Sequence, residues 1–158
     1  MDQRNRSGRI RQSILDRIIR EEPEPRDWEA SVERLKDNLL RDLEWLLNTR
    51  ESGSPATAPR VELEQSIYNY GLPDFASMSA DASTTPARLL RMIEREIELF
   101  EPRLKDVRIH RADDDAKAKS TRSLKFVIEA TLRLDPDPER VEFDTVLEMN
   151  SGRFTVTE

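Results

Sequence analysis

The hydrophobic period of the chain changes at Glu101-Pro102, and this change constrains the fold more than any other feature of the sequence. Before this point apolar residues recur at spacings of three and four, as in helices, and after it they alternate with polar residues, as in strands. Pro102 disfavours the α region for the residue before it, so the chain must leave the helix there. Helices therefore precede strands, which predicts an α+β fold with N-terminal helices packed on a C-terminal antiparallel β-meander of three to four strands.

The first predicted helix spans residues 9 to 21, where Pro23 and Pro25 stop a helical pattern formed by Ile10, Ile14, Leu15, Ile18 and Ile19. A helix this short is not stable alone, so its apolar stripe must pack on the rest of the chain or on a neighbour. We assign residues 1 to 22 to an Arg-rich arm carrying this helix, and residues 23 to 158 to a single α+β domain.

Charge distinguishes the arm from the next segment of the chain. Residues 1 to 20 hold six Arg against two Asp, whereas residues 21 to 50 hold five basic against nine acidic residues. Two interpretations of the arm stay open: a solvated extension, or a segment that docks on an acidic partner.

A longer helix is predicted from an N-cap at Asp27 to about Asn48. Its apolar face is formed by Val32, Leu35, Leu39, Leu43 and Leu46, and is widened by Leu40 and Leu47. Burying five such side chains contributes about 1.5 to 3 kcal/mol each, so this helix should form the centre of the core. Trp28 and Trp45 are expected to pack in the core or at its rim.

Residues 49 to 60 lack periodicity and are predicted to form a surface loop. A short helical piece should follow from about residue 62 to 70, with Leu63 and Ile67 facing inward and Gly71 as its left-handed C-cap.

Thr84 or Thr85 can cap the helix that leads to the corner, with Pro86 in its first turn. The apolar positions of this helix are Leu89, Leu90, Ile93, Ile97 and Phe100. After Leu104, period-two alternation predicts the meander, with turns at Asp113 to Arg122, Asp135-Pro136-Asp137-Pro138 and Asn150-Ser151-Gly152.

Composition excludes several classes of function. The chain has no cysteine and a single histidine, His110, which removes disulfides, iron–sulfur clusters, thiol nucleophiles and multi-histidine metal sites. A net charge of −6 argues against a nucleic-acid partner. No apolar run approaches the roughly 18 residues of a membrane helix, so we expect a cytoplasmic protein without direct membrane insertion. Cofactor motifs are absent from the sequence as well, and we expect neither cofactor nor metal.

Hydrophobic residues make up 36% and charged residues 37% of the chain, which is polar for a globular domain. We therefore expect a thin core, or helix faces that other chains complete. Asp113, Asp114 and Asp115 lack the spaced oxygen ligands of a calcium loop, so a solvated hairpin tip is the preferred interpretation.

The Glu101-Pro102-Arg103 triplet has two interpretations. It is either a helix stop with two solvated charges, or a rigid corner that holds an arginine fork and a carboxylate in the fixed geometry that bidentate recognition of a partner requires. The residue pattern alone leaves both open.

Five ordered blocks, covering almost the whole chain, resemble the TssE family of type VI secretion baseplate proteins: Ser13-Ile14-Leu15-Asp16-Arg17, Arg41-Asp42-Leu43-Glu44-Trp45-Leu46-Leu47-Asn48-Thr49-Arg50, Tyr70-Gly71-Leu72-Pro73-Asp74, Phe100-Glu101-Pro102-Arg103-Leu104 and Val141-Glu142-Phe143-Asp144-Thr145.

The resemblance implies an α+β domain that joins TssF and TssG in a wedge complex and initiates the contractile sheath of TssB and TssC. TssK and other baseplate proteins are further expected partners, and the expected location is the baseplate at the inner face of the inner membrane. In that family the Glu-Pro-Arg triplet is the characteristic partner-contact motif, which here falls on Glu101, Pro102 and Arg103. The sheet is expected to offer strand edges similar to those exchanged between sheath subunits.

The family is also similar to a phage-tail baseplate wedge protein with a lysozyme-like label, so a peptidoglycan hydrolase is the alternative function. Glu98 and Glu101 are the only carboxylate pair worth naming for it, and neither sits in a sequence motif for catalysis. We expect an assembly component and not an enzyme, with no catalytic residues.

Overall fold

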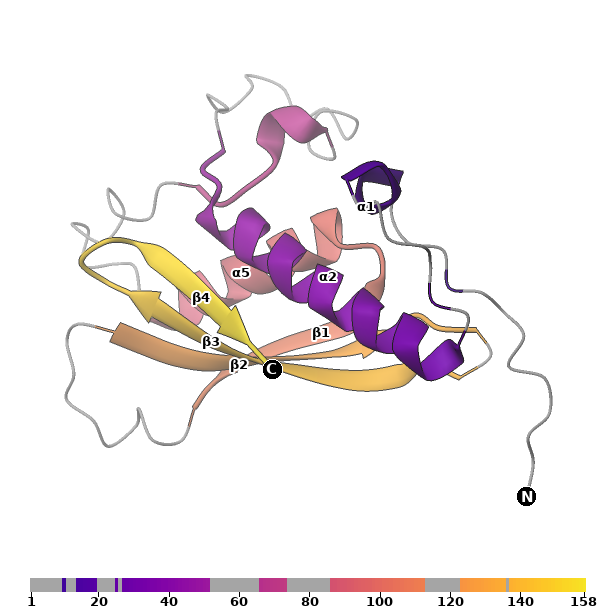
Figure 1. Ribbon diagram of the computed structural model, residues 1–158. Coiled ribbons are helices and arrows are strands. Elements are labelled where there is room, and N and C mark those ends of the chain that lie inside the picture. Colours follow the sequence, from indigo (N-terminus) through magenta and orange to yellow (C-terminus); the bar gives the residue numbers. More distant parts are fainter. Residues whose placement is uncertain are drawn as a thin grey trace.

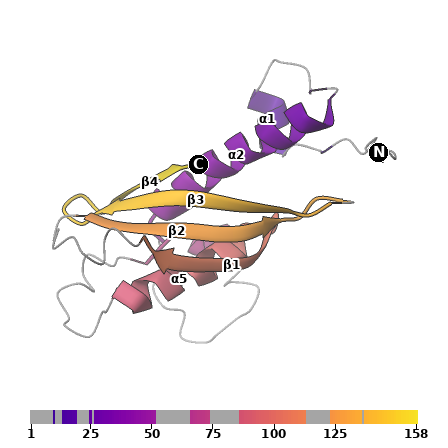
Figure 2. The same cartoon turned by 90° about the horizontal axis from the view of Figure 1, so that it is seen from below.

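The computed structural model describes residues 10, 14–19, 25, 27–51, 66–73, 86–112, 123–135 and 137–158. Two helices, α2 and α5, pack on one face of a four-stranded antiparallel sheet (Figure 1). Seen from below, the strands lie in front of both helices (Figure 2). The predicted α+β fold is confirmed.

Helix α2 (Trp28–Asn48) is the longest element and begins where the sequence predicts. The Asp27 side chain accepts a hydrogen bond from the amide of Ala30 at 3.4 Å, which caps the first turn. The predicted apolar face is buried, at Val32, Leu35, Leu39, Leu43, Leu46 and Leu47. The indole of Trp28 packs half-buried against this core, whereas that of Trp45 is exposed.

Helix α5 (Pro86–Phe100) covers the rest of the sheet with the predicted residues Leu89, Leu90, Ile93 and Ile97. It ends at Phe100, and the amide of the next residue, Glu101, makes the last helical bond, to the carbonyl of Ile97 at 2.8 Å. The Leu104 amide then donates to the Glu101 carbonyl, closing the corner that Pro102 imposes. The proposed caps Thr84 and Thr85 lie outside the described residues.

The four strands are β1 (Leu104–Arg111), β2 (Ser123–Leu132), β3 (Glu139–Glu148) and β4 (Arg153–Thr157), ordered as they occur in the chain. Their inward side chains alternate with mostly polar ones. The rings of Phe126 and Phe154 meet edge to face, with centroids 6.3 Å apart. The Asn150-Ser151-Gly152 turn is confirmed, whereas Asp113 to Arg122 lie outside the described residues.

A β-bulge interrupts the start of β1. Lys105 pairs with Thr131 and Arg108 with Glu129, so three steps on β1 match two on β2. Asp106 lies in the bulge, and its φ of 54° is in the left-handed region. The bulge allows Leu104, Val107 and Ile109 all to face the helices although their spacing departs from strict alternation.

The predicted helical piece at residues 62 to 70 differs from the structure. Its described part is a single 3₁₀ turn, η1 (Ile67–Asn69), and Ile67 is 91% exposed, so its predicted inward orientation is wrong. Tyr70 packs edge-on against Phe100 instead, with ring centroids 5.3 Å apart. Leu63 lies outside the described residues.

Gly71 serves a close backbone approach and does not cap an α-helix. Its φ is +116°, and a Cβ there would lie 2.6 Å from the carbonyl oxygen of Thr49. This approach lets the Leu72 amide donate to that oxygen at 2.9 Å, which joins the segment to the end of α2.

The side chain of Asn48 occupies part of the free edge of β4. Its amide nitrogen donates to the Phe154 carbonyl and its amide oxygen accepts from the Phe154 N–H, both at 2.9 Å. These are the bonds that a neighbouring strand would make. One side chain of α2 therefore both anchors β4 and blocks one position of its edge.

Replacing Asn48 with alanine should lower the free energy of unfolding by about 1 kcal/mol, because two backbone groups of β4 lose their partners. Urea denaturation measures this loss. Asp37→Ala, at an exposed position of the same helix, is the matched control, since Asn and Asp have similar helix propensities. Equal stability of the two variants would contradict the anchoring role.

Candidate functional site

The predicted partner-binding triplet lies at the corner between α5 and β1. Pro102 is exposed, but Glu101 is only 6% exposed and the Arg103 side chain 25%. The Arg103 carbonyl accepts a hydrogen bond from the Arg133 amide at 2.8 Å, which fixes the corner to the end of β2. Two charged side chains are thus held on a rigid backbone and partly withdrawn from water.

The guanidinium of Arg103 binds the carboxylate of Glu101 in a bidentate manner, through Nε to Oε1 and Nη2 to Oε2 at 2.5 Å each. Its Nη2 also contacts Oδ2 of Asp42 on α2 at 2.7 Å. Burial disfavours the charged guanidinium, but the hydrogen bonds and negative charges of Glu101 and Asp42 outweigh it and raise the pKa of Arg103.

The same ion-pair network continues from α2 to α1 (Ile14–Ile19). Asp42 accepts from Arg41 at 2.7 Å, and Arg41 Nη2 contacts Oδ1 of Asp16 at 2.6 Å. Asp16 is 2% exposed, and the Arg41 guanidinium lies 4.8 Å from the centre of the Trp45 ring. Alternating charges therefore connect the corner, the middle of α2 and the N-terminal helix, and we call these five residues the charge network: Glu101, Arg103, Asp42, Arg41 and Asp16.

Tyr70 lies in the field of this network. Burial raises the pKa of its phenol first, the negative charges of Asp42 and Glu101 raise it further, and the positive charge of Arg103 opposes them. Residues from four of the five sequence blocks thus come together in one region, although they are up to 87 positions apart in the chain. The resemblance singled out these blocks in the sequence, but only the fold shows that they lie next to one another.

Neither interpretation of the triplet predicted this arrangement. The charges of Glu101 and Arg103 are paired within the chain, so Arg103 is not the solvated arginine that a simple helix stop would leave. One donor of Arg103, Nη1, is buried without a hydrogen-bond partner within the described part of the chain. The partner-binding role of the three residues stays a prediction.

Large apolar side chains are exposed on α1, α2 and η1. They are Ile18 and Ile19 on α1, Trp45 on α2, and Ile67 and Tyr68 on η1. Ile10 is half-buried against the core while Ile18 and Ile19 face solvent, so packing of the stripe of the first helix on a neighbour stays a prediction.

Glu98 and Glu101, the pair considered for hydrolysis, do not share a hollow. Glu98 is exposed on α5, and Glu101 is engaged by Arg103. A neighbouring carboxyl, Glu96, has a pKa raised by burial and by Glu51, with Arg95 opposing; no pattern in the sequence pointed to it. A raised pKa alone does not make a carboxyl catalytic.

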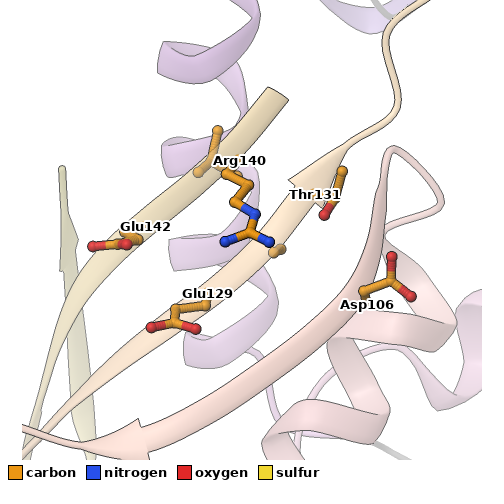
Figure 3. A pocket seen from close by; sticks show the side chains of 7 residues that line it. Asp106, Glu129, Thr131, Arg140 and Glu142 are labelled. Atoms are coloured by element: carbon orange, nitrogen blue, oxygen red, sulfur yellow. The ribbon is translucent and has the colours of Figure 1, made fainter. Parts of the chain in front are cut away.

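The sheet face turned away from the helices carries a polar hollow of about 430 Å³. Figure 3 shows Arg140 extending from β3 toward Glu129 and Thr131 of β2, with Glu142 and Asp106 at the rim. Glu129 and Glu142 are directly opposite in the register, so like charges face each other across the two strands. The hollow is shallow and polar, and it is not an enclosed ligand site.

Other candidate positions show ordinary surroundings. His110 is an exposed strand residue, 3.6 Å from Glu129, and Asp113, Asp114 and Asp115 lie outside the described residues. Across the described ranges, no group of three metal-binding side chains comes together. Nor does any helix there combine the length and apolarity needed to cross a membrane.

Comparison with known proteins gives one family match. The family model of the baseplate wedge protein gp25 matches residues 33–137, more than half of the chain, from α2 through the corner to the turn after β2. A chain of a solved structure entitled "The baseplate complex from the type VI secretion system" is similar at 18% identity, covering 79% of this chain and 97% of that chain, with a TM-score of 0.44. No curated protein matches.

Arg103→Ala should lower the free energy of unfolding by about 2 kcal/mol, because it leaves the buried carboxylate of Glu101 without its counter-charge. Urea denaturation of the isolated chain is the measurement, with the exposed Arg140→Ala as the matched control. A change no larger than that of Arg140→Ala would show that the charge network does not stabilise the fold.

Proposed function

Because the chain belongs to the baseplate wedge protein gp25 family, we propose that it is a structural subunit of the type VI secretion baseplate and not an enzyme. The five sequence blocks that resemble TssE support the type VI assignment. The subunit would act in the cytoplasm, at the inner face of the inner membrane, as that resemblance implies.

The corner at Glu101, Pro102 and Arg103 is the proposed docking point for TssF or TssG. The observation that carries this proposal is the buried Nη1 of Arg103, which has no hydrogen-bond partner among the residues that the structure describes. Glu101 and Asp42 hold the guanidinium in place through its other donors. Because Nη1 is buried in the isolated chain, docking would have to uncover it before a carboxylate or carbonyl of the partner completes its hydrogen bonds. Pre-ordering the arginine lowers the entropy that docking costs.

Apolar contacts would supply the remaining affinity of the wedge contact. Exposed Trp45 and the isoleucines of α1 flank Arg41 and Asp16, so a charged centre is combined with apolar neighbours. Interfaces commonly draw most of their binding energy from tryptophan, tyrosine and arginine. TssK and other baseplate proteins are further candidates for these surfaces.

Sheath initiation would use a strand edge. The backbone N–H of Ala112 donates to the carbonyl of Lys125 on β2. Successive residues of a strand point their backbone groups to opposite sides, so the N–H and C=O of Ile109, three residues earlier, point away from β2. They lie at the free β1 edge of the sheet. On the β4 edge, Asn48 already binds the equivalent groups of Phe154. We therefore propose β1 as the edge to which a strand of TssB or TssC adds.

Arg103→Ala should reduce co-purification of TssF and TssG at least tenfold, since a docking arginine is a typical hot spot. Asp42→Ala is the comparison variant, because it removes one salt bridge but leaves the Arg103 side chain present and still held by Glu101, so we expect a smaller loss of partners. Both variants need to be compared at a temperature where urea denaturation shows them folded. If both variants lost TssF and TssG to the same extent, the Arg103 side chain would have no docking role of its own.

Ile109→Pro removes an edge-facing N–H of β1 and should reduce assembly of TssB/TssC sheath on the purified wedge, because an added strand loses one backbone bond. Val156→Pro is the control on the other edge, where the same alternation also turns the N–H outward. Equal effects of the two prolines on sheath assembly would argue against β1 as the initiating edge.

A further inference from the structure

A second hollow, of about 310 Å³, lies where the first turns of α2 meet the turn between β2 and β3. Both elements are found at the same end of the molecule in Figures 1 and 2. Apolar side chains line it at Trp28, Val32, Leu134 and Pro138, and carboxylates line it at Glu29, Glu33, Asp137 and Glu139. We call this hollow the acidic groove.

The carboxylates of the acidic groove are poorly neutralised. Its single basic residue, Lys36, contacts Glu139 at 2.7 Å and Glu158 at 3.9 Å. Within the part of the chain that the structure describes, Glu29, Glu33 and Asp137 make no salt bridge. The groove thus combines an indole and aliphatic carbons with excess negative charge, which suits arginine side chains.

The chain itself supplies such side chains. Arg4, Arg6 and Arg9 lie in the nine residues that precede Ile10, and Ile10 is half-buried against the same core on which Trp28 packs. Nine residues span up to about 30 Å when extended. The groove extends along α2 from Trp28 to Lys36, which is about 12 Å of helix. The extended segment is therefore longer than the groove that it would cover.

We propose that the acidic groove binds residues 1–9 of the same chain. Guanidinium groups contact Glu29 and Glu33 and stack on Trp28, while the arginine stems cover Val32 and Leu134. Tethering gives the segment an effective concentration on the order of millimolar, so contacts that are weak between separate molecules suffice. Because the pairs are exposed, added salt weakens the contact.

The experiment uses Trp28 as the reporter. Trp45→Phe leaves Trp28 as the only tryptophan, and its fluorescence is followed while a synthetic peptide of residues 1–12 is added to a chain lacking residues 2–9. We expect saturable binding, with a Kd at least tenfold weaker for the double variant Glu29→Lys, Glu33→Lys. The peptide with Arg4, Arg6 and Arg9 replaced by Gln should not bind.

Two controls determine whether the groove and the tether are responsible. Glu142→Lys with Glu148→Lys makes the same charge change on the outer sheet face and should leave the Kd within about twofold. The chain that keeps residues 1–9 should bind the added peptide about tenfold more weakly, because its own segment competes.

Absence of saturable binding, or equal effects of the two double variants, would overturn the groove as the site. Equal peptide affinity with and without residues 2–9 would overturn the intramolecular contact and favour a basic segment of another protein. The measurement needs no baseplate partner, so a negative result leaves the proposed function untouched.

Discussion

The guanidinium of Arg103 lies between the carboxylates of Glu101 and Asp42, and this contact joins the helix-to-strand corner to α2. The helices have only a few direct contacts with each other and are held mainly through the sheet, so an ion pair between the corner and α2 fixes their relative positions. The charge network continues through Arg41 to Asp16, and this contact joins the N-terminal helix to the same region. A partly buried network of this kind is sensitive to loss of any member, because the remaining charges lose their partners.

The proposed docking role and the folding role therefore fall on the same arginine. A subunit that must add to a preformed complex benefits from a charged group that is already oriented, and here Glu101 and Asp42 orient it. The cost is that mutation of Arg103 perturbs both functions at once. Comparison with Asp42→Ala separates them, since that change removes one of the two supporting carboxylates and keeps the guanidinium paired with Glu101.

The two edges of the sheet differ in how much of their backbone is left unpaired. Asn48 makes strand-like hydrogen bonds to Phe154 at β4, which reduces the unpaired backbone that could attract another strand there. At the other edge, the bulge at Asp106 lets β1 keep its apolar residues inward while its backbone follows the corner. An assembly protein with two open edges would risk adding strands on the wrong side, and one blocked position lowers that risk.

The sequence by itself determined the helices and strands, because period 3.6 before Glu101 and period 2 after Leu104 specify which faces are buried, and Pro102 specifies where one pattern ends. It failed at Ile67, where a single 3₁₀ turn has no apolar periodicity to fix its orientation. Tertiary structure alone decided that Arg103, already paired with Glu101, also pairs with Asp42, which precedes it by 61 positions in the chain. Long-range ion pairs leave no periodic trace in a sequence with 37% charged residues, since any of many opposite charges could be the partner.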